Sequence, residues 1–93
     1  MKVAASITQK LTAAFQPARL EVVDDSRSHA GHAGAQPGGE THFNVVIVSD
    51  AFAGKSRIER QRLVYGVLAD ELAGPVHALS VTILTGAEAT ARA

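Results

Sequence analysis

The first segment of the chain repeats apolar residues with the spacing of a helix. These residues follow one another at intervals of four, four, three and one positions: Val3, Ile7, Leu11, Ala14 and Phe15. Such spacing gathers the apolar side chains on one side, so we predict an amphipathic helix here. Pro17 ends it, because the residue before a proline is pushed out of the helical region.

Three later segments carry apolar patterns that predict β-strands. Residues 19–24 (RLEVVD) and 76–85 (VHALSVTILT) alternate apolar side chains with polar or small ones. Residues 42–49 (HFNVVIVS) are apolar on both faces, with Phe43 on one face and Val46 on the other. A strand of this kind is expected at the centre of a sheet or covered on both sides.

A second helix is predicted before the last strand. Ser56 followed by Glu59 has the pattern of a capping box, in which each side chain bonds the backbone of the other residue. An apolar stripe follows: Val64, Tyr65, Leu68 and Leu72. The Gly-Pro pair at 74–75 stops the helix. Residues 50–54 are expected to form a turn or short helical piece, and residues 86–93 a short, frayed helical turn.

The order helix, strand, loop, strand, turn, helix and strand predicts a single α+β domain over residues 1–93. We expect a small three-stranded sheet with both helices packed on one face. The first two strands can form a hairpin with an enlarged connection, and the last strand follows a helical crossover and can pair in parallel. The four aromatic residues are expected in the core: Phe15, Phe43, Phe52 and Tyr65.

The charge balance and the absence of cysteine argue against several classes of function. Nine acidic and nine basic residues give a formal net charge of zero, which argues against bulk attraction to nucleic acid or to an anionic membrane. Without cysteine the chain can form neither a disulfide nor a thiolate metal site of its own, which favours a reducing, cytoplasmic setting. No apolar run is long enough to cross a bilayer, and the N-terminus lacks the continuous apolar core of a signal peptide.

A glycine-rich loop separates the first two predicted strands. The stretch SHAGHAGAQPGGETH contains His29, His32 and His42, and its flexible part is expected at about residues 26–41. Loops this long are usually functional or disordered. One interpretation is a mobile connection whose histidines have no special role. The other is metal ligation by two or three imidazoles, including His77, although His77 can equally be a hydrogen-bonded core residue and no cysteine or carboxylate pattern supports a closed site.

Four basic residues cluster at the start of the second predicted helix: Lys55, Arg57, Arg60 and Arg62. They can form a phosphate-binding patch at a helix start. The alternative is a solvated helix face, which is slightly favoured because no aromatic residues are interleaved for base stacking. The sequence Gly54-Lys55-Ser56 imitates the end of a phosphate-binding loop, but Ser49 stands where that loop needs its first glycine, so we exclude a nucleotide site there.

Four pieces of the sequence, taken in order, resemble the BolA family along nearly the whole chain. They are Val23-Asp24-Asp25-Ser26 followed by His29; Glu40-Thr41-His42-Phe43 leading to Val48-Ser49 and Phe52-x-Gly54; Arg60-Gln61-Arg62-Leu63-Val64-Tyr65; and Val76-His77-Ala78-Leu79. The resemblance implies a class II KH-like fold of order α-β-β-α-β with short extra helical turns, and a helix-turn-helix element around residues 50–72. One departure is Gln61, where the family usually has a histidine, and we expect it to be tolerated.

The resemblance also implies a non-enzymatic function in iron–sulfur cluster trafficking or in iron and redox regulation. BolA-like proteins form heterodimers with monothiol glutaredoxins and share a [2Fe-2S] cluster, for which the glutaredoxin supplies a cysteine and bound glutathione. The position matched by His77 supplies one ligand and the loop supplies the second. His29 and His32 both remain candidates, and the position in the sequence relative to Asp24-Asp25-Ser26 favours His29. The isolated chain is expected to hold no tightly bound cofactor and to be a monomer or weak homodimer.

An alternative function comes from family members that are described as DNA-binding transcription regulators. The phosphate contacts would then be the four clustered bases: Lys55, Arg57, Arg60 and Arg62. Binding would weaken steeply with salt, and arginine substitutions would impair it whereas His77→Ala would not. The cluster function predicts the opposite, namely that His77→Ala impairs function whereas the arginine substitutions do not. The zero net charge argues against strong DNA affinity.

Overall fold

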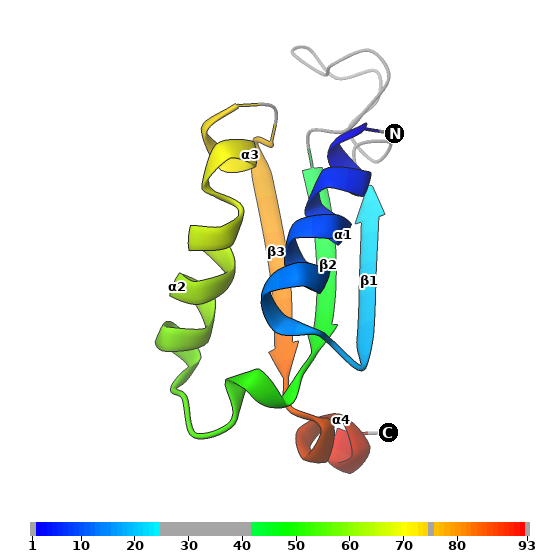
Figure 1. The fold of residues 1–93 in the computed structure, drawn as a ribbon, viewed down its shortest axis with the longest axis vertical. Coiled ribbons are helices and arrows are strands. Elements are labelled where there is room, and N and C mark those ends of the chain that lie inside the picture. The colour runs from blue at the N-terminus through cyan, green and yellow to red at the C-terminus, as the bar shows by residue number, and fades with distance from the viewer. Residues whose placement is uncertain (1, 25–41, 75, 93) are drawn as a thin grey trace.

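Eight helices and strands follow one another in the computed structural model, which describes residues 2–24, 42–74 and 76–92 (Figure 1). In chain order they are α1 (Lys2–Phe15), β1 (Arg19–Asp24), β2 (His42–Val48), the 3-10 helix η2 (Asp50–Phe52), α2 (Arg57–Val67), α3 (Ala69–Ala73), β3 (Ala78–Leu84) and α4 (Gly86–Arg92). This order contains every predicted element and adds a division of the second helix.

The three strands form one mixed sheet in which β2 lies between β1 and β3, as its apolar pattern predicted. β1 pairs antiparallel with β2, with Val22 opposite Val45, which confirms the predicted hairpin. β3 pairs in parallel with β2, with Ala78 opposite His42. A parallel pair needs a crossover between its strands, and here η2, α2 and α3 form it.

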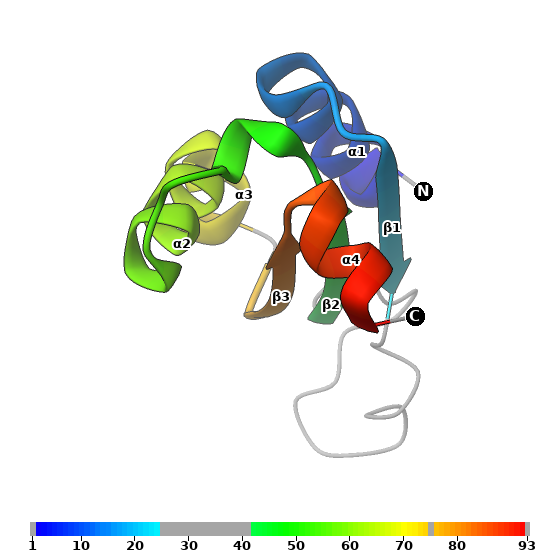
Figure 2. The ribbon, with the colours of Figure 1, turned by 90° about the horizontal axis from the view of Figure 1, so that it is seen from below.

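The helices α1, α2 and α3 cover one face of the sheet, and α4 lies at the end where β2 and β3 terminate (Figures 1 and 2). Buried apolar side chains fill the space between the layers: Ile7, Leu11, Phe15, Phe43, Val45, Ile47, Phe52, Val64, Leu68 and Val76. On β2 these residues share one face, whereas Asn44 on the other face is exposed. Burying one such large apolar side chain contributes roughly 1.5–3 kcal/mol, so this layer supplies the main driving force for folding.

Ser49 joins the end of α1 to the end of β2. Its hydroxyl donates to the carbonyl oxygen of Phe15 at 2.6 Å and accepts from the amide of Ala51 at 3.1 Å. Directly after α1, Gln16 has a φ of 45°, and Pro17 prevents the helix from continuing, as predicted. The buried hydroxyl therefore satisfies a C-terminal carbonyl group of α1 inside the protein.

Three expectations from the sequence differ from the structure. Tyr65 is 37% exposed and not a core residue, because its neighbour Val64 takes the position on α2 that faces the core. The second helix is divided at Leu68, whose φ of −99° and ψ of 19° separate α2 from α3. The residues after β3 form the regular helix α4 rather than a frayed turn. Within the described part of the chain, none of the helices has the length and apolar character that spanning a bilayer requires.

Candidate functional site

His77 is exposed on the turn that precedes β3, at the end of the sheet where β2 and β3 begin and β1 ends. β3 begins at Ala78, which lies opposite His42, the first residue of the parallel strand β2. The antiparallel strand β1 finishes at the same end with Asp24. Both flanks of the segment 25–41 therefore lie at the end of the sheet that carries His77.

The structure locates two of the four histidines. His77 is exposed, so the alternative that it is a buried core residue is wrong, and His42 is half-buried at the first position of β2. His29 and His32, the predicted loop ligands, lie outside the described residues. Among those that are described, no group of three or more His, Cys, Asp or Glu side chains could hold a metal ion. A metal at this end would therefore take further ligands from the segment 25–41 or from another molecule.

Glu71 on α3 contacts both the turn that carries His77, through its main-chain carbonyl, and α1, through its buried carboxylate. The amide of Val76 donates to the carbonyl oxygen of Glu71 at 3.0 Å, and the Val76 side chain is buried. The Glu71 side chain is also buried, and it accepts hydrogen bonds from Ser6 Oγ at 2.5 Å and from Lys10 Nζ at 2.9 Å. Glu71 therefore ties α3 to α1 shortly before the exposed histidine.

Opposing influences act on the ionisation of Glu71. Burial raises the pKa of this carboxyl group, whereas the hydrogen bonds from Ser6 and Lys10 lower it, and the balance leaves the pKa below its ordinary value. The hydrogen bond to Glu71 in turn raises the pKa of Lys10. Both groups are therefore charged at neutral pH, and each stabilises the ionised form of the other.

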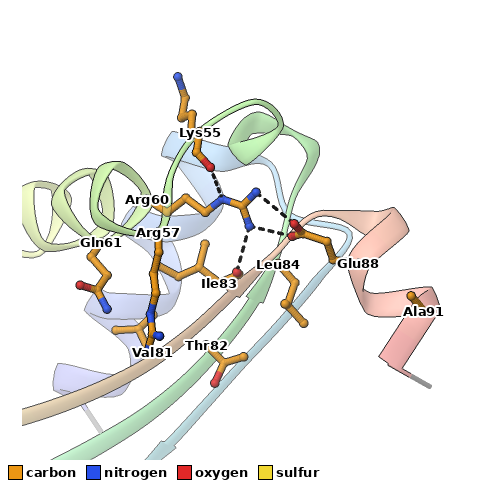
Figure 3. A pocket seen from close by; sticks show the side chains of 10 residues that line it. All are labelled: Lys55, Arg57, Arg60, Gln61, Val81, Thr82, Ile83, Leu84, Glu88 and Ala91. Carbon is orange, nitrogen blue, oxygen red and sulfur yellow. Dashed lines mark hydrogen bonds and ion pairs between the residues drawn. The ribbon is translucent and has the colours of Figure 1, made fainter.

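An open groove lies between β3 and the start of α2, toward the opposite end of β3 (Figure 3). Its lining residues are Lys55, Arg57, Arg60, Gln61, Val81, Thr82, Ile83, Leu84, Glu88 and Ala91. The capping box that starts α2 is confirmed, because Ser56 Oγ accepts from the Glu59 amide at 3.1 Å and Glu59 Oε1 accepts from the Ser56 amide at 2.8 Å. Three of the four predicted phosphate contacts border this groove, whereas Arg62 does not.

Arg60 differs from the other three bases because its guanidinium group is bound within the protein. It donates to the Glu88 carboxylate at 2.7 and 3.2 Å, and its Nε donates to the carbonyl oxygen of Lys55 at 3.0 Å. Nη1 also donates to the carbonyl oxygen of Ile83 at 3.4 Å. The Arg60 side chain is only 13% exposed, and Glu88 neutralises its charge. The other three bases are exposed.

The same carboxylate starts α4. Glu88 Oε1 accepts from the Thr85 amide at 2.8 Å, and Thr85 Oγ1 accepts from the Glu88 amide at 3.2 Å. The amide of Gly86 donates to Asp50 Oδ1 at 3.1 Å. Hydrogen bonds from Arg60 and from the Thr85 backbone lower the pKa of Glu88 to about 2. The sequence Thr85-x-x-Glu88 is itself a capping-box pattern and could have predicted this helix start.

Known proteins resemble the chain in sequence. The family model for the BolA-like protein matches residues 11–88. SufE-like protein 1, chloroplastic/mitochondrial, from Arabidopsis thaliana is 52% identical over 86 residues, which are 88% of this chain and 23% of that protein. The DNA-binding transcriptional regulator BolA of Escherichia coli strain K12 is 47% identical over 85 residues, which are 91% of this chain and 77% of that protein.

The same relationship is seen between structures. BolA1 from Arabidopsis thaliana superimposes on the chain with a TM-score of 0.81 and 40% sequence identity. The match covers 92% of this chain and 94% of that chain. The mixed three-stranded sheet with its helices on one face is therefore shared almost from end to end with a solved structure.

Replacing Glu71 with alanine is expected to destabilise the protein by about 1–3 kcal/mol, because Ser6 and Lys10 lose a buried, charged acceptor. Urea unfolding at neutral pH measures the change. Asp70→Ala is the matched control, because the Asp70 side chain is 95% exposed and lies 3.7 Å from the same lysine. Its removal is expected to change the free energy of unfolding by less than about 0.5 kcal/mol. Equal effects of the two substitutions would contradict a special role of the buried carboxylate.

Glu88 makes the stability depend on pH in the acid range. Its pKa of about 2 in the folded protein lies below the ordinary value of 4.5, so between these values the unfolded chain binds more protons. The stabilisation from this group is present above pH 4.5 and is lost as the pH falls toward 2. Glu88→Gln is expected to flatten this part of the stability profile, measured as the thermal midpoint at stepped pH. A variant profile that runs parallel to the wild-type profile would contradict this assignment.

Proposed function

The chain belongs to the BolA family, and from this premise we propose that it is a non-enzymatic partner of a monothiol glutaredoxin. In the heterodimer it contributes histidine ligands to a bridging [2Fe-2S] cluster. The glutaredoxin supplies its cysteine and its bound glutathione as the remaining ligands. The pair acts in iron–sulfur cluster trafficking or in iron and redox regulation.

The position of His77 is the observation that carries this proposal. The residue is exposed, and the amide of its neighbour Val76 is bonded to the main-chain carbonyl of Glu71, so its imidazole can reach a group held by another molecule while the described elements keep their positions. The segment that contains His29 and His32 leaves β1 and enters β2 at the same end of the sheet. A second imidazole from that segment can therefore approach the same metal.

The available donors fit a site that two molecules share. Because the chain has no cysteine, every thiolate of an iron–sulfur cluster has to come from the partner. Histidine ligands on one iron and cysteine ligands on the other are the arrangement of Rieske centres, where they raise the reduction potential. Here His77 supplies one imidazole, and His29 or His32 supplies the other.

Titration of the chain into a cluster-loaded monothiol glutaredoxin tests the shared site. The visible absorption and circular dichroism of the cluster are expected to change with the wild-type chain. With His77→Ala the spectrum of the glutaredoxin alone is expected to persist, because one iron ligand is lost. Either His29→Ala or His32→Ala is expected to behave in the same way and thereby to identify the loop ligand.

His42→Ala is the matched control at the same end of the sheet, because His42 is half-buried in β2. We expect it to give the wild-type spectral change. If His42→Ala abolishes the change while both loop variants retain it, the second ligand belongs to β2 instead. If the wild-type chain forms no complex with a cognate glutaredoxin and leaves its cluster spectrum unchanged, the proposal is wrong.

Exposed bases at the start of α2 support a second candidate function, which is the direct binding of DNA. The Escherichia coli relative is named a DNA-binding transcriptional regulator. Lys55, Arg57 and Arg62 are exposed, and none of the ion pairs among the described residues involves them. Arg60 is already paired with Glu88, so the phosphate contacts come from the other three bases.

Fluorescence anisotropy of a labelled DNA duplex at increasing salt tests this second function. Lys55→Ala and Arg57→Ala are each expected to weaken binding to all sequences and to reduce the slope of log K against log salt by about 1, because each removes one phosphate contact. His77→Ala is the control and is expected to leave the slope unchanged. A slope that neither basic substitution alters would exclude this surface as the DNA contact.

A further inference from the structure

β3 is an edge strand, and two hydrogen bonds show which of its backbone groups face outward. The carbonyl oxygen of Leu84 faces the end of β2, where the Ser49 amide donates to it at 2.9 Å. The carbonyl oxygen of Ile83 faces the other way and accepts from Arg60 at 3.4 Å. Because successive residues of a strand turn their backbone groups to opposite edges, Val81 shares the outward direction of Ile83.

The groove follows this outer edge. Val81 and Ile83 line it from the face that packs on the helices, whereas Thr82 and Leu84 line it from the opposite face. The backbone groups between them, the amide and carbonyl of Val81 and the amide of Ile83, therefore open into the groove. Its volume of about 810 Å³ lies within the range of about 300–1,000 Å³ that is typical of binding pockets.

The lining of the groove carries a surplus of positive charge. Arg60 and Glu88 neutralise each other, which leaves Arg57 and Lys55 as the other charged residues of the lining, and Lys55 also interacts with the carboxylate of Glu59 outside the lining. Figure 3 shows Arg57 extending from α2 toward β3, whereas the Lys55 side chain points away from the strand at the outer rim. This local surplus occurs in a chain whose formal net charge is zero, so it favours an acidic occupant.

We propose that the outer edge of β3 binds an extended, acidic segment of a partner protein, which adds to the sheet as a fourth strand. Main-chain hydrogen bonds to Val81 and Ile83 hold the segment, and one of its carboxylates pairs with Arg57. Arg60 already donates to the Ile83 carbonyl, so the part of the edge that can pair with the segment ends at the Ile83 amide. The groove lies toward the other end of β3 from His77, so this surface is separate from the proposed cluster ligands.

Two other occupants fit the groove less well. A single-stranded nucleic acid would use the positive charges, but none of the lining residues is aromatic, so the groove offers no platform for base stacking. A second copy of the chain, paired edge to edge, would bring two Arg57 side chains and two Lys55 side chains together, and like charges repel. An acidic polypeptide is complementary to both the charge and the alternating donors and acceptors of the edge.

A titration followed by amide NMR shifts of the full chain tests the proposal. The probe is a capped peptide of about seven residues that alternates valine with glutamate, a length typical of one strand. The amides of Val81 and Ile83 are expected to shift as they gain hydrogen-bond partners. The same peptide with lysine in place of glutamate is expected to bind more weakly. An acidic peptide with N-methyl groups on consecutive residues, which has lost its main-chain donors and is crowded by the methyl groups, is expected to bind more weakly.

Two charge reversals on α2 locate the binding site. Arg57→Glu is expected to weaken the binding of the acidic peptide by about tenfold, because it replaces an attraction in the groove with a repulsion. Arg62→Glu is the matched control: it makes the same change of charge on the same helix, outside the groove lining, and is expected to change the affinity by less than about threefold. The spectrum of each variant without peptide reports whether its fold is intact.

Several results would overturn the proposal. They are no shift of the β3 amides at millimolar peptide, undiminished binding of the N-methylated or lysine peptide, and equal effects of Arg57→Glu and Arg62→Glu. Displacement of the peptide by a short oligothymidylate that binds more tightly at the same amides would assign the groove to nucleic acid. Concentration-dependent shifts of these amides in the absence of peptide would assign the edge to a second copy of the chain.

Discussion

The parallel pairing of β2 with β3 is the constraint on which both candidate sites depend. It obliges the chain to return through η2, α2 and α3 before β3 can begin. The return ends on the turn of His77, at the end of the sheet where β1 stops and β2 starts. It also leaves β3 at the edge beside the start of α2, which creates the groove. An antiparallel β3 would place His77 a full strand length away from the histidine-bearing segment.

Two carboxylates hold the short helices in place beside these sites. α3 has five residues and α4 has seven, and isolated helices of this length are unstable in water. Glu71 fastens α3 to α1 through Ser6 and Lys10, and Glu88 fastens α4 to α2 through Arg60. The apolar layer folds the sheet and the long helices together, and these ionic contacts position the elements at the margin of that layer.

Local patterns were sufficient to predict the elements of the fold, because alternation and capping act between residues close in sequence. The apolar faces of β2 and the capping box at Ser56 were found in this way. Contacts across long separations were not accessible to such patterns. Arg60 looked equivalent to its neighbouring bases because its partner, Glu88, lies 28 residues away. The exposure of His77 likewise depends on where the crossover ends, which no spacing in the sequence specifies.

One carboxylate both caps α4 and neutralises Arg60, so the stability of α4 and the charge of the groove are coupled. Short helices open locally at free energies below that of global unfolding. An opening that withdraws Glu88 leaves the Arg60 guanidinium, still bonded to the carbonyls of Lys55 and Ile83, without its counter-charge and makes the groove more positive. An anionic occupant therefore stabilises the opened state relative to the closed one. The exchange with solvent of the Thr85 amide, which donates to Glu88, is therefore expected to quicken when the groove holds an anion.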